Sequence, residues 1–258
     1  MSWSTENSLN SNSGYASGGG GNSSGAISFC DDSDRDKSES YNGTSWTTEG
    51  NLIGTSRTNG ASGGGDDTDA IVHGGNFVTA ANEFNGTSWS SGGSASSGTT
   101  GSACDTGNST DAIKISGSTS YWNDVETVEE YNGTSWSTGG SVSVGSETLG
   151  GGGNSTDAIC MGGQVGSTDQ TRCEEYNGTS WSSGGALTTA ISQNGGGGDS
   201  TDAISIGGYT SSTHQAETET YNGTSWTAEA DDLNTARRWY GGGAGGNASD
   251  AVAFGGNS

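Results

Sequence analysis

Short apolar stretches recur along the chain, and in each of them bulky residues alternate with small or polar ones. In the stretch TDAISIGG at 201–208, Ile204 and Ile206 fall on one side of an extended chain, and Ala203 and Ser205 fall on the other. Such a strand can bury both faces. The corresponding bulky pairs in the other copies are Ile27 and Phe29, Ile71 and His73, Ile113 and Ile115, Ile159 and Met161, and Val252 and Phe254.

A second motif, an aromatic residue followed by Asn-Gly-Thr-Ser-Trp, occurs five times, and Ser2–Trp3 matches the end of a sixth copy. Asn-Gly is the preferred pair for a two-residue type I′ hairpin turn. The motif therefore predicts a strand that ends at the aromatic residue and a second strand that starts at Thr and leads to Trp.

The repeat has the length of a propeller blade. Its tryptophans, at positions 3, 46, 89, 136, 181 and 226, are separated by 43, 43, 47, 45 and 45 residues. A strand-rich period of this size is typical of β-propellers, and the high glycine content excludes helical repeats. The sequence predicts one all-β domain over 1–258, a six-bladed β-propeller whose Gly-rich strands are innermost. The expected anchors between blades are Trp3, Trp46, Trp89, Trp136, Trp181, Trp226, Tyr41, Phe84, Tyr131, Tyr176 and Tyr221.

The closing blade is expected to combine both ends of the sequence, with the stretch around Trp3 supplying its outer strand. The strand that precedes the tryptophan in other copies has no counterpart there. Two outcomes are open. The blade could close up with three strands, or its open edge could pair with a strand of another chain.

Composition limits the partners. The 258 residues include 50 Gly and no Pro, with a net charge of -23, which alone would indicate disorder; the regular repeat argues against it. The acidity excludes nucleic acid and anionic membrane surfaces as partners. It favours a role in solubility over loosely bound calcium, because no acidic stretch has EF-hand spacing. No segment predicts membrane insertion, a signal peptide or a cofactor.

A double glycine after an apolar strand, then a Glu/Tyr strand and a tryptophan, resembles the kelch repeat; the best copies are AISIGGY…ETETYNGTSW and CMGG…CEEYNGTSW. The sequence pattern is similar to that of Gly-rich kelch-like repeats of bacteriophages and marine microbes. This resemblance implies a propeller and a virion, extracellular or cell-surface location. Kelch units often carry an Arg after the tryptophan, which most units here lack. The ligand set of galactose oxidase, a copper enzyme of kelch type, has no match.

The loops that differ between copies all fall on one face of the predicted propeller, where binding sites usually lie. Trp122 lies outside the repeat, and with Tyr121, Asn123 and Asp124 it forms a candidate sugar-binding loop; packing of this loop on itself is the alternative. Weaker candidates are Tyr209, His214, Arg237 and Arg238.

The cysteines are the remaining residues with a possible chemical role. Cys160 and Cys173 flank one hairpin, so they could form a disulfide in an oxidising compartment, although two buried free thiols are favoured. No set of residues predicts catalysis or a metal site. We therefore expect a non-enzymatic binding or structural propeller that recognises glycan or protein through the variable loops. The alternative is a scaffold that joins subunits, itself or a longer fibre, through the open sixth blade.

Overall fold

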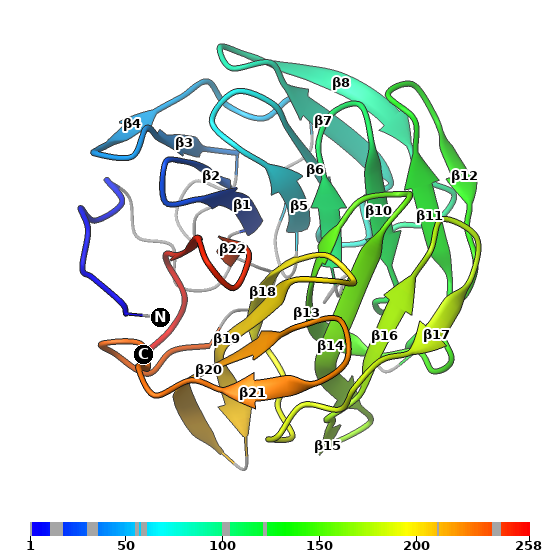
Figure 1. Cartoon of the computed structure of the whole chain (residues 1–258). Coiled ribbons are helices and arrows are strands. Elements are labelled where there is room, and N and C mark those ends of the chain that lie inside the picture. Colours follow the sequence, from blue (N-terminus) through cyan, green and yellow to red (C-terminus); the bar gives the residue numbers. More distant parts are fainter. Residues whose placement is uncertain are drawn as a thin grey trace.

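The computed structural model describes residues 2–10, 18–29, 36–54, 57, 61–99, 104–120, 123–210, 212–238 and 244–258. These residues form antiparallel sheets that are arranged in a ring (Figure 1). Among them, no helix is long and apolar enough to cross a membrane.

Five sheets each contain four strands in series, in the order in which the chain visits them. The first is β1 (Gly18–Asn22), β2 (Gly25–Phe29), β3 (Ser38–Tyr41) and β4 (Trp46–Thr48), and the second is β5 (Ala61–Gly65), β6 (Ala70–Gly74), β7 (Ala80–Phe84) and β8 (Trp89–Ser94). The third is β9 (Cys104–Gly107), β10 (Ala112–Ile115), β11 (Val128–Tyr131) and β12 (Trp136–Thr138). The fourth is β13 (Glu147–Gly153), β14 (Ala158–Val165), β16 (Cys173–Tyr176) and β17 (Trp181–Ser183), with the short β15 (Thr168–Asp169) beside β14. The fifth is β18 (Gly195–Gly198), β19 (Ala203–Thr210), β20 (Thr213–Tyr221) and β21 (Trp226–Ala228).

The remaining two strands, β22 (Ala244–Gly246) and β23 (Ala251–Ala253), form a two-stranded sheet between the fifth sheet and the first. The prediction of six blades is therefore wrong: the protein is a β-propeller with five complete blades. In the part of the chain that the structure describes, the sixth position in the ring holds two strands, one fewer than the three-stranded closing blade that the sequence allowed.

The Gly-rich strands lie innermost, as expected, because neighbouring backbones approach too closely there for side chains. A Cβ atom on Gly20 would lie 2.7 Å from the carbonyl oxygen of Gly65, and one on Gly245 would lie 2.4 Å from that of Gly21. The second contact joins β22 to β1, so the two-stranded sheet closes the ring of inner strands.

The aspartate of the TDA motif links a sheet to the next at five of the six junctions; the first sheet has Gly25 in its place. Asp111 Oδ1, for example, accepts the backbone N–H of Ser155 at 3.0 Å, in the turn of the following sheet. The equivalent pairs are Asp69–Ser109, Asp157–Ser200, Asp202–Ala248 and Asp250–Ser23. The motif is thus a structural device, and the two-stranded sheet takes part in it on both sides.

The Asn-Gly hairpins differ from the predicted two-residue turn. Tyr41 is paired with Trp46, so four residues connect the strands, and only Gly43 among them has a positive φ, of 83°. The Asn42 side chain accepts the backbone N–H groups of Thr44 and Ser45, both at 3.0 Å. This side-chain capping of the loop removes the need for φ > 0 at the asparagine.

Each tryptophan of the five complete blades packs on its own hairpin and on the preceding sheet. The Trp89 ring lies 5.1 Å from Phe84 in the same hairpin and 6.1 Å from Phe29 in the sheet before, measured between ring centroids. Its Nε1 donates to Ser38 Oγ at 2.8 Å. The tryptophans therefore fill the space between blades.

Cys160 and Cys173 are buried free thiols on opposite faces of the fourth sheet. In the register of β14 and β16, Cys160 faces Glu174 and Cys173 faces Met161, so the two side chains point in opposite directions. This geometry excludes the disulfide that the sequence left open. Burial raises the pKa of Cys173 to about 12.

We expect Trp89→Ala to lower the free energy of unfolding by about 3–5 kcal/mol, because it empties the space between two blades. Trp89→Phe keeps a ring and is expected to cost about 1–2 kcal/mol. Urea denaturation of the three proteins measures both losses. Equal stability of Trp89→Ala and the parent would contradict the anchoring role.

Candidate functional site at the sixth position

The N-terminal segment, residues 2–10, runs along the outside of the ring beside the sixth position (Figure 1). Half-buried Trp3 packs in a cluster with Ile204 and Ile206 of β19 and with residues of β23. Its Nε1 donates to Thr218 Oγ1 at 3.1 Å. Thr218 and Ser38 each stand three residues before the tyrosine of their strand, so Trp3 makes the contact that Trp89 makes in a complete blade.

The same equivalence holds further along this segment. The backbone N–H of Asn10, seven residues after Trp3, donates to Glu39 Oε2 at 2.7 Å. Between the second and third blades, the backbone N–H of Ser96, seven residues after Trp89, donates to Glu129 Oε1 at 2.7 Å. The N-terminal segment therefore occupies the place of the outer strand, although it forms no strand.

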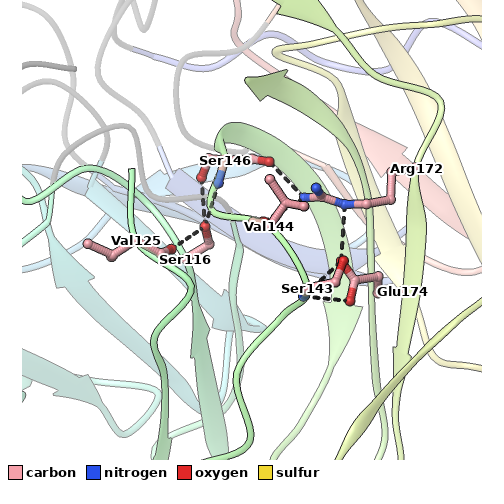
Figure 2. Close-up of polar contacts among 7 residues, drawn as sticks. All are labelled: Ser116, Val125, Ser143, Val144, Ser146, Arg172 and Glu174. Atoms are coloured by element: carbon pink, nitrogen blue, oxygen red, sulfur yellow. Dashed lines mark hydrogen bonds and ion pairs between the residues drawn. The ribbon is translucent and has the colours of Figure 1, made fainter. Parts of the chain in front are cut away.

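In four of the five complete blades, a glutamate on the third strand holds the segment that follows the preceding tryptophan. Figure 2 shows one case, in which Glu174 of β16 accepts the Ser143 backbone N–H at 2.9 Å and the Ser143 hydroxyl at 2.8 Å. Arg172 Nε lies 3.1 Å from the same carboxylate, and its Nη2 donates to Ser146 Oγ at 2.7 Å. This glutamate therefore joins two blades.

The next residue on the third strand serves the blade on the other side. The hydroxyl of Tyr176 in β16 donates to Glu130, and that of Tyr221 in β20 donates to Glu175. Tyr131 and Glu83 form the equivalent pair. Burial and then the glutamate hydrogen bond raise the pKa of Tyr221 to about 12. A third strand with two consecutive glutamates thus bonds to both of its neighbours.

The sixth position lacks this third strand in the part of the chain that the structure describes. A cavity of about 830 Å³ lies there, between β23 and the N-terminal segment. Its wall includes Trp3, Tyr41, Trp46, Leu233 and Asn234. Residues of β23 and the N-terminal segment, which takes the place of the outer strand, line this cavity.

Among the variable-face candidates, the structure brings Tyr209, His214 and Arg238 together. The rings of Tyr209 and His214, cross-strand neighbours in β19 and β20, lie 5.7 Å apart, and the Arg238 guanidinium lies 4.5 Å from the centre of the Tyr209 ring. Arg237 instead donates from Nη1 to the carbonyl of Gly255 at 2.5 Å, which anchors the C-terminal residues.

The other loop candidates are less informative. Tyr121 and Trp122 lie outside the described residues. Asn123 Nδ2 donates to Thr119 Oγ1 at 2.8 Å, and Asp124 accepts the Ser118 hydroxyl at 2.5 Å. Both side chains therefore bond within their own loop.

A second cavity, of about 360 Å³, lies where the TDA turns meet, and Asp and Asn side chains line it. Asp111, Asp157 and Asp202 there accept backbone N–H groups of the next turn. The described residues include no group of three or more His, Cys, Asp or Glu side chains placed to hold a metal ion. The calcium considered from the sequence gains no ligand cluster from this arrangement.

Comparison with known proteins decides the architecture. No family model matches the chain, and no curated protein matches it either. Among solved structures, that of YjhT superimposes with a TM-score of 0.70, over 91% of this chain and 88% of the other, at 11% sequence identity. The chain has a β-propeller fold. At this identity the likeness shows the fold alone, and the similarity to kelch repeats remains a resemblance.

Sequence reasoning missed the two glutamates of the third strand. The signal was present, because Glu-Glu-Tyr occurs in both β11 and β16 and Glu39 precedes Tyr41 by two residues. Exposed strand positions commonly carry Glu, so the pattern alone did not indicate that the side chains would reach into neighbouring blades.

The buried pair of Lys114 and Glu129, joined at 2.8 Å, makes stability depend on pH. Burial acts to raise the pKa of Glu129, but hydrogen bonds from Lys114 and Ser96 outweigh it and lower the pKa. The resulting stabilisation is present above the ordinary Glu pKa and is lost as the pH falls through the lowered value. We expect Glu129→Gln to cost about 3–5 kcal/mol at pH 7, because it leaves the Lys114 charge buried and unpaired.

Urea denaturation between pH 3 and pH 7 measures this effect. The stability difference between the parent and Glu129→Gln should shrink toward acidic pH, and the double variant with Lys114→Met should recover much of the loss. A difference that stays constant across this range would contradict the assignment.

Proposed function

We propose that this protein is a non-enzymatic binding and structural propeller that takes up an extended strand of a partner protein at its sixth position. The observation that carries this proposal is the cavity between β23 and the N-terminal segment, which has the surroundings of a third strand and holds no strand of the described residues. The partner would be a subunit of a larger assembly, such as a fibre at a virion or cell surface.

Two properties of the site support strand uptake. An open sheet edge offers backbone donors and acceptors to a pairing strand, and main-chain pairing of this kind is a common mode of peptide recognition. The inner strands and the N-terminal segment already hold the walls of the site in place. An incoming strand therefore meets a largely preformed site, which reduces the entropic cost of binding.

The histidines support a role without catalysis. His73 is buried, with its ring 5.2 Å from that of Trp136, and His214 packs against Tyr209. Both side chains are thus engaged with aromatic rings, which suits packing roles rather than proton transfer.

The proposal predicts that a covalently attached third strand will stabilise the protein. We would extend the chain after Ser258 with a copy of residues 166–179 that carries Cys173→Val. The copied strand should fill the cavity and raise Tm by several degrees, because it binds the folded state alone. The control extension has Ser in place of the copied Glu174, Glu175 and Tyr176.

Differential scanning fluorimetry compares the two extended chains with the parent. The proposal requires a higher Tm for the copied strand than for the control. If both extensions leave Tm at the parental value, the sixth position does not accept a strand.

The cluster of Tyr209, His214 and Arg238 favours a second candidate function, recognition of glycan or protein by the variable loops. An aromatic face beside a cation and an imidazole can stack on a sugar ring and bond to its hydroxyls. Tyr209 and His214 are half-exposed near the end of the β19–β20 hairpin, and Arg238, which follows β21 in the chain, is half-exposed beside them.

We expect Tyr209→Ala to weaken binding at least tenfold if a glycan binds to this cluster. A panel of labelled glycans identifies the ligand, and Ile53→Ala, at a residue that is 46% exposed, is the matched surface control. Trp122→Ala tests the other loop candidate separately. A glycan that binds equally to all three variants does not use these loops.

A further inference from the structure

We infer that the strand taken up at the sixth position is acidic and aromatic, with two consecutive glutamates followed by tyrosine or phenylalanine. This inference rests on the proposed function and specifies the partner. It follows from three groups around the cavity, for each of which counterparts in complete blades contact a third strand.

The first group is the backbone N–H of Asn234. In the fourth blade, Leu187 N donates to Thr171 O at 2.9 Å, and the next residue, Thr188, donates to Glu219 of the following third strand at 2.8 Å. In the fifth blade, Leu233 N donates to Ala216 O at 3.0 Å, so the next residue, Asn234, occupies the place of Thr188.

The Asn234 residue lines the cavity, and no acceptor among the described residues bonds to its backbone N–H. A glutamate two residues before the aromatic position of an incoming strand would supply that acceptor, as Glu219 does in the fifth blade. This assigns the first glutamate of the pattern.

The second group is the hydroxyl of Tyr41. Its counterparts in Tyr131, Tyr176 and Tyr221 each donate to a glutamate on the third strand of the preceding blade. For Tyr41 the preceding blade is the incomplete one. The Tyr41 side chain lines the cavity, and its hydroxyl has no hydrogen bond within the described part of the chain. A glutamate directly before the aromatic residue of the incoming strand would accept this bond.

The third group is the indole ring of Trp3. In the complete blades, the repeat tryptophan packs against the aromatic residue of its own hairpin, with ring centroids 4.9–5.1 Å apart. Trp3 lines the cavity and has no such partner among the residues that the structure places. An aromatic residue at the end of the incoming strand would complete the pair.

The net charge of the protein gives an independent test, the salt dependence of peptide binding. The protein carries a net charge of -23, so its overall field opposes an acidic peptide, while the local donors are neutral groups. Salt screens the long-range repulsion more than it weakens buried hydrogen bonds. Binding should therefore strengthen as salt rises from 0.05 to 0.5 M, on the order of a few-fold.

The probe is a fluorescent peptide that copies residues 126–134 of this chain, ETVEEYNGT, and its binding to the full chain is measured by fluorescence anisotropy. Three control peptides carry Glu129→Ala with Glu130→Ala, Tyr131→Ser, or two N-methylated backbone amides. We expect each control to bind about tenfold or more weakly, because these changes remove, in turn, the two glutamate acceptors, the aromatic ring and the main-chain pairing.

Protein variants locate the contacts. Tyr41→Phe should weaken binding of the parent peptide about tenfold and should leave binding of a Glu130→Ala peptide unchanged, which couples the two groups. Tyr131→Phe is the matched control, because it removes the equivalent hydroxyl in the third blade, which does not line the cavity. Circular dichroism and Tm confirm that each variant is folded.

The outcomes separate this inference from the proposed function. Equal binding of the parent and double-Ala peptides would overturn the acidic pattern, while strand uptake would stand. If no peptide binds and the extended chain gains no stability, both fall. Unchanged binding by Tyr41→Phe and by Trp3→Ala would place the peptide elsewhere and overturn the inference.

Discussion

The whole architecture depends on the close approach of backbones around the central axis. Inner strands such as β1, β5 and β22 meet with so little space between them that a Cβ atom on Gly20 or Gly245 would collide with a neighbouring carbonyl. Glycine at these positions carries an entropic cost on folding. It also brings the aspartate of each TDA turn within hydrogen-bonding reach of the next turn, so the ring is held at its narrowest point.

This tight axis explains how a chain with 27% hydrophobic residues forms an ordered core. Aromatic pairs such as Phe84 and Trp89 fill the wider space toward the outside, where blades diverge. Buried carboxylates such as Glu129 and Glu174 then tie neighbouring blades together through charge-assisted hydrogen bonds. Polar contacts therefore make many of the connections between blades that apolar side chains make in proteins with more hydrophobic residues.

The sequence predicted the elements that depend on local pattern and missed those that depend on contacts between blades. Alternation in Ile204–Ile206 predicted β19, and the glycine runs predicted the inner strands. The hairpin at Asn42 differed because the side chain, rather than the backbone conformation, satisfies the loop. The opposite orientations of Cys160 and Cys173 depend on a one-residue register, and the roles of Glu130 and Glu175 depend on a tyrosine about 46 residues away. No local pattern contains that information.

The incomplete sixth position is compatible with a closed ring because closure does not require a third strand. β22 joins β1 and β18 at the axis, Asp202 and Asp250 link the turns, and Trp3 and Asn10 bind to the blades on either side. The walls of the cavity are thus held by contacts that an incoming strand would neither make nor break. A strand that enters such a site adds its own contacts to a ring that is already closed. The propeller can therefore fold first and bind a partner strand afterwards.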